Sequence, residues 1–141
     1  MAFEGRVVLI EDDDAWSLLP QSGLARLLYT RSALPAVRVL PFVLCGRTMV
    51  LALDFGAVEH LTHVIGSVTA VEVDDPLSAW SVTITSEAHE ATSVCDESFA
   101  HDPALSRWLD GDPKAYLRIE PTLVCGQQFV PACPGAGHSG S

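Results

Sequence analysis

Positively charged residues are scarce in this sequence. Its 141 residues include seven Arg and one Lys against 18 Asp and Glu, which gives a formal net charge of −10. A protein that binds nucleic acid needs a row of cations to replace the counterions of the phosphates, and these few cations are scattered. Anionic membrane surfaces are disfavoured for the same reason. The composition therefore argues against nucleic acid and membranes as partners.

Long apolar segments are also missing. No run is long enough to span a bilayer, and the short apolar stretch near the N-terminus is followed by acids rather than by a small-residue cleavage site. With 48% hydrophobic residues, the chain can still build the core of one domain. We expect a single globular domain located in the cytoplasm.

Cysteine motifs are absent as well. The four cysteines form no CxxC pair, so neither a zinc knuckle nor a dithiol redox motif is indicated. The sequence likewise contains no P-loop, no nucleophile elbow and no Gly-rich dinucleotide fingerprint. In a cytoplasmic chain the cysteines are expected to be reduced.

Apolar runs separated by turn residues predict a series of β-strands. WSVTITSEA, residues 80–88, alternates apolar and polar side chains as a half-buried strand does. Thr-Arg-Ser-Ala-Leu-Pro, residues 30–35, is typical of a hairpin connection. The other predicted strands, of which the last is one strand or a pair, lie at residues 24–29, 36–44, 48–53, 68–73 and 116–130.

Three short helices are predicted between these strands. The first should be capped by Asp14 and end at Pro20. The second should run over about 57–65, because a Gly precedes it and another follows it, and the third over about 103–109. About six antiparallel strands with two or three short helices indicate a mainly β fold, a small barrel closed to remove its edges.

The sequence divides into three parts. We expect an N-terminal arm at 1–13, the barrel domain at 14–130 and a disordered tail at 131–141, where Gly, Pro and Ser dominate.

The order of these segments resembles one known family. PAVRVLPFVLCGRTMVLAL at 35–53, VEVDD followed by the tryptophan-led WSV strand, and YLRIEPTLVCG at 116–126 resemble the pyridoxamine 5′-phosphate oxidase-like, FMN-binding split-barrel family of actinobacterial type. The resemblance covers roughly residues 14–130. It implies an antiparallel split β-barrel that forms a homodimer, with small-molecule sites at the subunit interface. It also implies FMN as cofactor, or the deazaflavin F420 or haem as in relatives, and an oxidoreductase activity.

One part of the family pattern is missing. The resemblance implies basic residues at the end of the strand near Leu53 and at the start of the following helix, where they hold the flavin phosphate. This sequence has Ala52 and Asp54 at the first place and Glu59 at the second. A phosphate dianion beside two carboxylates would meet like-charge repulsion. The phosphate site is therefore expected to be lost or moved.

Five residues are candidates for cofactor contact on the strength of the resemblance: Arg38, Leu40, Leu53, Trp80 and Ser81. Arg38 lies on an otherwise apolar strand and could replace the missing cations; otherwise it faces outward opposite an acid on the next strand. Trp80 could lie near the cofactor ring or pack in the barrel, and Ser81 could hydrogen-bond the ring edge or point outward.

Two histidine clusters are weaker candidates. His60 and His63 are three residues apart on the predicted helix and could share a face. No strong third ligand is present, so we expect no metal site, whereas haem contact needs one His only. Glu87 and His89 share a strand face and Glu90 points away, which is a poor acid–base pair.

Two hypotheses for function follow. The chain is an FMN- or F420-dependent oxidoreductase of unidentified substrate. Alternatively, it is a flavin-free member that binds haem or another small molecule in the same cleft, acts as a protein-interaction module, or catalyses a reaction without redox chemistry.

Overall fold

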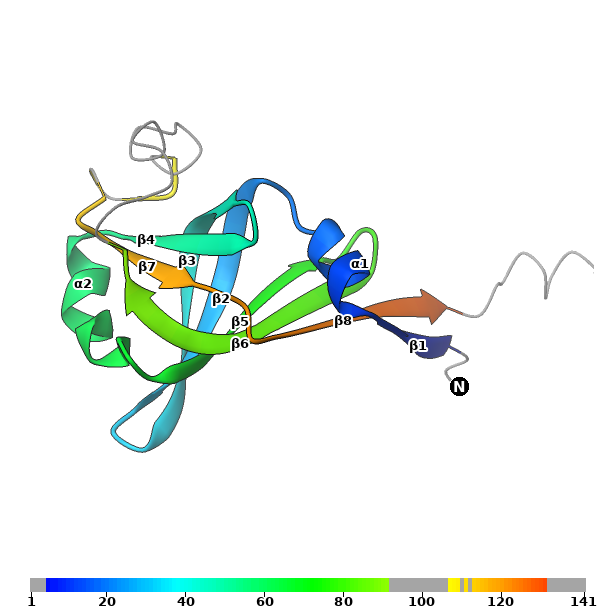
Figure 1. Ribbon diagram of the computed structural model, residues 1–141, viewed down its shortest axis with the longest axis horizontal. Coiled ribbons are helices and arrows are strands. Elements are labelled where there is room, and N and C mark those ends of the chain that lie inside the picture. Colours follow the sequence, from blue (N-terminus) through cyan, green and yellow to red (C-terminus); the bar gives the residue numbers. More distant parts are fainter. Residues whose placement is uncertain (1–4, 92–106, 110, 112, 132–141) are drawn as a thin grey trace, which may run out of the picture.

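The described part of the chain forms a mainly β structure with two short α-helices (Figure 1). The computed structural model describes residues 5–91, 107–109, 111 and 113–131. The strands are β1 (Gly5–Ile10), β2 (Ser22–Arg31), β3 (Leu34–Cys45), β4 (Thr48–Leu53), β5 (Val68–Asp75), β6 (Trp80–Glu90), β7 (Ala115–Ile119) and β8 (Leu123–Pro131). The helices are α1 (Asp12–Ser17) and α2 (Phe55–Leu61), and a 3-10 turn at Thr62–Val64 follows α2.

Six of the strands close into an antiparallel barrel. The neighbours run β6-β5-β2-β3-β4-β7, and β7 pairs back onto β6. β8 pairs with the other part of β6, and β1 pairs with β8, so these two strands form a ribbon that extends from the barrel (Figure 1). The predicted closed barrel of six strands with short helices is confirmed.

Alternation along the strands builds the core. In β6 the side chains of Val82, Ile84, Ser86 and Ala88 are buried, while those between them are half-buried or exposed. Phe42, Leu27, Met49, Leu51 and Ile119 contribute large side chains to the same core from the other strands. Because every second residue faces the interior, most polar residues of β5 and β6 stay in contact with water, and the exceptions are Thr69 and Ser86.

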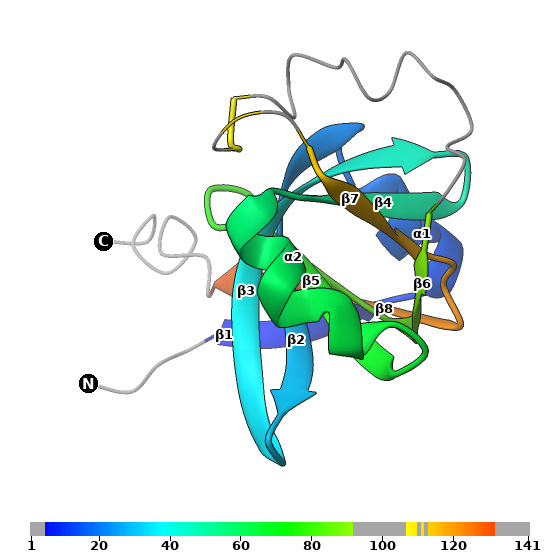
Figure 2. The same cartoon turned by 90° about the vertical axis from the view of Figure 1, so that its left-hand side faces the viewer.

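α2 lies across one end of the barrel (Figure 2). Ala57, Leu61 and Val64 are buried there in the same core as the strands. The helix begins where the Asp54 carboxylate accepts a hydrogen bond from the Ala57 amide at 2.9 Å. The predicted helix over 57–65 is confirmed in position, although it starts at Phe55 and its last turn is a 3-10 turn.

α1 packs on β8 at the other end of the barrel (Figure 1). Ala15 is fully buried and lies so close to Gly126 that a Cβ placed on this glycine would be 2.7 Å from the Ala15 Cβ. The prediction that Asp14 caps this helix is wrong, because the helix starts at Asp12 with Glu11 as its N-cap. The acids of its first turn suit the positive end of the helix dipole.

Several other predictions can be compared with the structure. The 30–35 hairpin is confirmed, with a tight turn at Ser32 and Ala33, both of which have positive φ. The last strand proves to be the pair β7 and β8. Residues 5–10 of the predicted arm form β1, while the helix at 103–109 and the tail lie largely outside the described residues. Cys45 is disulfide-bonded, so the expectation of reduced cysteines is wrong for this residue.

No helix in the part of the chain that the structure describes is long and apolar enough to cross a membrane.

Candidate functional site

Arg38 points toward the start of α2. It lies on β3 opposite Leu27 and is half-buried. A Cβ placed on Gly56, in the first turn of α2, would be 3.9 Å from the Arg38 Nη2. Among the described residues no acid forms an ion pair with this guanidinium, so the alternative of an outward Arg opposite a cross-strand acid is not what the structure shows. Arg38 is therefore a cation available to a ligand near α2.

The positions at which the family resemblance implies cations have other side chains in this chain. Ala52 is fully buried in an apolar cluster on the outer face of β3 and β4, together with Val43 and Val50. Asp54 uses its carboxylate to cap α2. At this place by itself a phosphate dianion is disfavoured, because the Ala57 amide is already bonded to Asp54 and a negative charge stands beside it. A phosphate near the start of α2 would therefore depend on Arg38.

Leu40 and Leu53 are core residues. Each has 3% of its surface exposed, and both belong to the main apolar cluster of the barrel. Within one chain they support the wall behind Arg38 rather than present a surface to a ligand. Their predicted contact with a cofactor stays a prediction.

Trp80 and Ser81 lie at the α1 end of the barrel. Trp80 is half-buried, packs against the core and stands opposite Asp75 in the β5–β6 pair. It lines two cavities of about 380 and 270 Å³, and Arg38 lines neither of them. The structure thus places Arg38 and Trp80 at opposite ends of one barrel, with Leu40 and Leu53 in the core.

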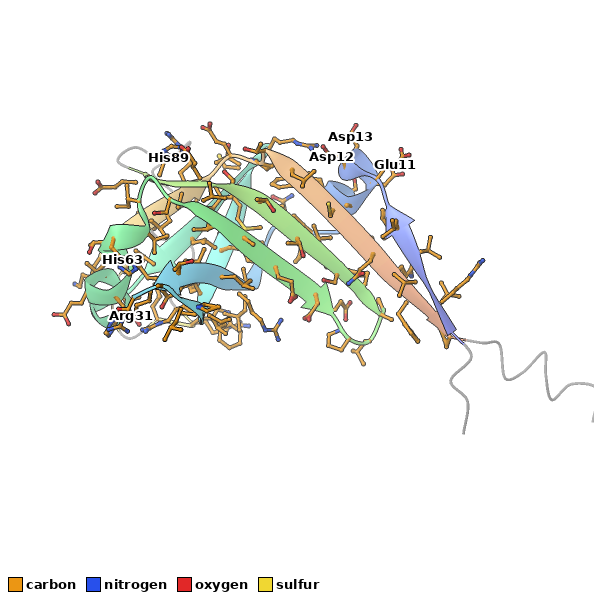
Figure 3. All side chains as sticks on the ribbon, turned by 90° about the horizontal axis from the view of Figure 1, so that it is seen from below. Glu11, Asp12, Asp13, Arg31, His63 and His89 are labelled. Carbon is orange, nitrogen blue, oxygen red and sulfur yellow. The ribbon has the colours of Figure 1, made fainter. Side chains whose placement is uncertain are left out.

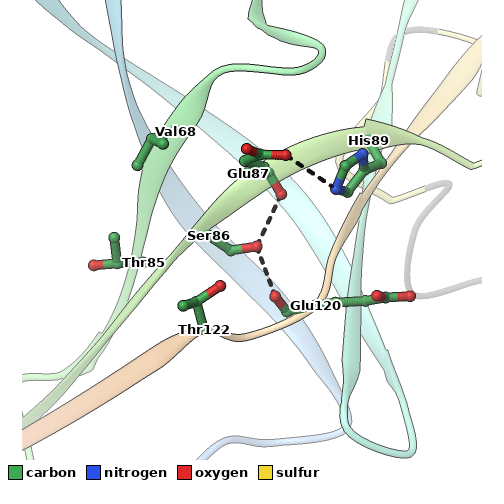
Figure 4. Close-up of a pocket in the computed structure, with 7 residues that line it drawn as sticks. All are labelled: Val68, Thr85, Ser86, Glu87, His89, Glu120 and Thr122. Carbon is green, nitrogen blue, oxygen red and sulfur yellow. Dashed lines mark hydrogen bonds and ion pairs between the residues drawn. The ribbon is translucent and has the colours of Figure 1, made fainter.

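A polar cavity of about 350 Å³ opens where β6 meets the β7–β8 connection (Figure 4). The Ser86 hydroxyl lies 2.6 Å from the Glu120 carbonyl oxygen and 2.8 Å from that of Glu87. The His89 Nε2 is 3.8 Å from the Glu87 carboxylate, which confirms that these two residues share a face. Because Ser86 is bonded to the main chain and not to His89, the cavity contains no activated serine nucleophile.

The helix histidines have structural contacts. His63, labelled in Figure 3, lies with its Nε2 3.3 Å from the Thr30 carbonyl oxygen. Its ring meets the Tyr29 ring edge-to-face, with centroids 6.0 Å apart. His60 is half-buried on α2. Within the described ranges, no three His, Cys, Asp or Glu side chains are grouped to hold a metal ion.

A group of charged side chains joins the β3–β4 turn to α1. Arg47 pairs with Asp12 and Asp13 and lies 5.4 Å above the Trp16 ring, so it connects the β3–β4 turn to α1. Asp12 and Asp13, labelled beside α1 in Figure 3, belong to this contact. Sequence analysis missed it because the residues are more than thirty positions apart.

A second group of charges lies on the outer face of β2 and β5. Arg26 faces Glu72 at 3.3 Å and Asp74 at 3.1 Å, so one cation serves two carboxylates. Burial, and then the neighbouring Asp74, raise the pKa of the Glu72 carboxyl above its ordinary value. Asp74 and Asp75 also line both Trp80 cavities. The sequence signal for the place of Asp74 and Asp75 beside these cavities is their position just before the turn that leads to Trp80.

Solved structures similar to this chain share its fold. A putative pyridoxamine 5′-phosphate oxidase from Corynebacterium glutamicum superposes with a TM-score of 0.72 at 19% identity, covering 90% of this chain and 96% of that one. The FAD binding protein from Mycobacterium smegmatis gives a TM-score of 0.62 at 21% identity, covering 87% and 98%. A FAD-binding protein from Mesorhizobium loti gives 0.66 at 16% identity, covering 89% and 98%.

Sequence comparison identifies the family. The uncharacterized protein Rv0080 of Mycobacterium tuberculosis is 31% identical over 133 residues, with 88% of this chain and 86% of that protein covered. The family model described as pyridoxamine 5′-phosphate oxidase matches residues 11–128, which include all six barrel strands. The chain therefore belongs to the pyridoxamine 5′-phosphate oxidase family.

Proposed function

We propose that this chain is a flavin-dependent oxidoreductase that uses FMN or the deazaflavin F420. The observation that carries the proposal is Arg38, a half-buried guanidinium with no ion-pair partner among the described residues, beside the start of α2. Family membership and the similarity to two FAD-binding proteins support it. The flavin, when bound, would accept and donate the hydride.

In this proposal Arg38 replaces the missing cations of the family pattern. Its guanidinium would donate two parallel hydrogen bonds to the cofactor phosphate, as arginine does to planar and tetrahedral oxyanions. Gly56 leaves room for a phosphate, because a larger side chain there would occupy the space beside the Arg38 Nη2. Leu40 and Leu53 would hold the strand ends behind Arg38, while Trp80 and Ser81 would exclude water from the ring and orient its edge.

A cofactor that touches both Arg38 and Trp80 requires two copies of the chain, because these residues lie at opposite ends of one barrel. We therefore propose a homodimer with the small-molecule site at its interface. An apolar strip on the outer face of β2 and β3 supports it: Leu28 faces Val37 across the pair, and Val37 and Val39 are 57% and 54% exposed. Exposed apolar strips of this kind mark interfaces.

Two measurements test the proposal. The first is a titration of the purified protein with FMN and separately with F420, followed by visible absorption after gel filtration. We expect a retained flavin or deazaflavin band, and Arg38→Ala should weaken binding by at least about tenfold, since it removes charge-assisted hydrogen bonds to the phosphate. Arg31→Ala, an exposed cation at the β2–β3 turn, and His60→Ala should leave affinity unchanged. Equal affinity of the wild type and Arg38→Ala would remove Arg38 from the site.

The second measurement is the molar mass in solution by light scattering. The wild type should have twice the mass of the chain, and Val39→Glu should shift it to the monomer because it places a charge on the apolar strip. Leu77→Glu, at a turn residue that is 98% exposed, is the matched control. A monomeric wild type would contradict the proposed interface.

The capped start of α2 favours a second candidate. Asp54 stands where the family resemblance implies a phosphate, so a flavin-free member would use the cleft for an uncoloured ligand or for haem. A folded dimer that retains neither FMN nor F420 would support this candidate. A Soret band after incubation with haem, lost in His60→Ala or His63→Ala, would identify haem as the ligand. The cytoplasmic location stays a prediction.

A further inference from the structure

Two cavities adjoin Trp80 at the α1 end of the barrel. They share Trp80, Asp74 and Asp75, and we refer to them together as the Trp80 groove. Trp80 pairs with Asp75 across β5 and β6, and buried Val82 pairs with buried Val73 in the same way. Both pairs face the same side of the sheet, and the Trp80–Asp75 pair is the one nearer the turn. The core face of the barrel therefore continues past its end and becomes accessible there, with Trp80 as its last apolar side chain.

The walls of the groove are apolar. Leu18 follows α1, Leu24 is on β2, and Phe42 comes from β3; these three line the larger cavity with Trp80. Val7 and Phe129, from the β1–β8 ribbon, line the smaller one. The two volumes, about 380 and 270 Å³, are at the small end of the range of natural ligand sites. The groove thus suits the hydrocarbon body of a small molecule.

The rim of the groove is negative. The described residues that line it include Asp74 and Asp75 and no Arg, Lys or His. Arg26 lies 3.1 Å from Asp74 but also faces Glu72, so its charge is already shared. Asp75 has no cation partner among the described residues: one of its oxygens accepts hydrogen bonds from the Leu77 and Ser78 amides at 3.0 and 3.4 Å. Its second carboxylate oxygen remains available.

We propose that the Trp80 groove binds an organic monocation, an ammonium group attached to an aromatic or aliphatic body. The ammonium group forms an ion pair with Asp75 and is also attracted by the negative charge of Asp74. The hydrocarbon body of the molecule lies on Trp80 and Leu24. An indole face beside a carboxylate attracts such a cation twice, through the ring quadrupole and through charge. A neutral molecule of the same shape gains the apolar contact only.

This inference rests on the proposed function in one respect. If Trp80 borders a flavin site, the organic cation is the class of substrate that the flavin would oxidise. Binding of the cation itself requires no flavin. The experiment is therefore carried out on the full chain without added cofactor, and Arg38→Ala is included because it should weaken FMN binding and leave cation binding unchanged.

The experiment compares three probes of one shape and different charge. Phenethylammonium, 2-phenylethanol and 3-phenylpropanoate are titrated into ¹⁵N-labelled protein, and the indole N–H resonance of Trp80 is followed, assigned by its loss in Trp80→Leu. Phenethylammonium should shift this resonance to saturation. The alcohol should bind about tenfold more weakly, and the carboxylate should not bind, because a charge-assisted hydrogen bond accounts for a factor of this size.

Two variants locate the ammonium group. Asp75→Asn keeps an oxygen that can accept the Leu77 amide, so the turn is retained, and it should weaken phenethylammonium about tenfold. Glu59→Gln removes an exposed carboxylate of α2 and should change nothing. Equal binding of ammonium and alcohol, no loss in Asp75→Asn with an unchanged melting temperature, or no shift of Trp80 at 10 mM phenethylammonium (about the limit of a weak specific site) would each overturn the inference.

A pair of outcomes separates this inference from the proposed function. Cation binding without retention of FMN or F420 would contradict the flavin proposal and leave the Trp80 groove as a cation site. Retention of a flavin without cation binding would contradict the inference alone.

Discussion

The two ends of the barrel are closed in different ways. α2 lies across one end with Ala57, Leu61 and Val64 buried beneath it, and its first turn is capped by the chain's own Asp54. At the other end, α1 packs on β8 to one side and leaves the Trp80 groove accessible. The family resemblance implies a phosphate site at the α2 end, where this chain has the Ala57 amide bonded to Asp54. The other end has an apolar groove with an acidic rim.

The comparison shows that a fold can be kept while the groups that recognise a ligand change. The barrel depends on alternating apolar residues, which are intact from β2 to β7. The phosphate site depends on two or three charged side chains, and substituting them leaves the core unaffected. Family membership therefore predicts the architecture of this chain more firmly than its chemistry.

Leu61→Ala should give the largest effect, at the closed end. The side chain is fully buried in the core, so its truncation should lower the free energy of unfolding by about 3 kcal/mol through lost transfer energy and a residual cavity. Urea unfolding followed by circular dichroism measures this. Leu77→Ala, at a turn residue on the other side, should change stability by less than about 0.5 kcal/mol. Similar losses for both variants would mean that α2 does not close the barrel.

Gly126→Ala should destabilise the open end by about 2 kcal/mol, because overpacking forces neighbouring atoms apart. The new Cβ would lie 2.7 Å from the Ala15 Cβ and 3.0 Å from that of Ile10, and neither atom can rotate away. Gly23→Ala is the matched control. Its new Cβ would lie 3.2 Å from the nearest atom of the Phe42 ring and 3.7 Å from Pro20. It should cost less in the same urea experiment. The reverse order would show that α1 is held loosely.

Asp54→Ala and Asp54→Asn separate the cap of α2 from its charge. The Ala variant should lose about 1 kcal/mol, the usual value of an N-cap, while Asn can still accept the Ala57 amide and should be nearly neutral. If the proposed function is correct, Asp54→Asn should also bind FMN more tightly, because a negative charge beside Arg38 is removed. Thermal unfolding and the FMN titration measure the two effects. Unchanged FMN affinity in Asp54→Asn would place the phosphate elsewhere.

Glu72→Gln should give the smallest effect, near the rim of the open end. The raised pKa of Glu72 means that the folded state holds this proton more tightly than the unfolded state does. The free energy of unfolding then falls as pH rises from the ordinary carboxyl pKa through the raised one. Glu72→Gln should remove this loss and raise the melting temperature by about 1–2 °C at pH 7.5, with no gain at pH 4. A gain at pH 4 alone would contradict the assigned direction.

The barrel could be predicted from the sequence because its signals are local. The alternation in residues 80–88 and the turn residues at 30–35 each specify structure within about ten positions, and both predictions are confirmed. The start of α1 was missed because Glu11 to Asp14 are four acids in a row and any of them could be the cap. Arg47, on a distant turn, contacts two of them and thereby favours one arrangement.

The candidate site was predictable only in part. The sequence singled out Arg38 as a cation on an apolar strand and Trp80 as the first residue of an alternating strand, but the separation of the two residues depends on how the barrel closes. Arg38 stands opposite Leu27 near α2, and Trp80 stands opposite Asp75 near α1. Strand register relates residues far apart in the chain, and no local pattern specifies it. Asp75 was overlooked for the same reason.

The β1–β8 ribbon joins the earliest and latest described segments of the chain, since Gly5 pairs with Pro131 and Ile10 with Gly126. During synthesis, β1 therefore waits for a partner on the order of ten seconds, until residues 123–131 have been made. The backbone N–H and C=O groups of β1 stay unpaired for that time, and Val7, Val8 and Leu9 beside them are exposed in the folded structure as well. The ribbon is thus the last part of the sheet to form on the ribosome, and a chain interrupted before β8 would release an apolar strand with nothing to pair with.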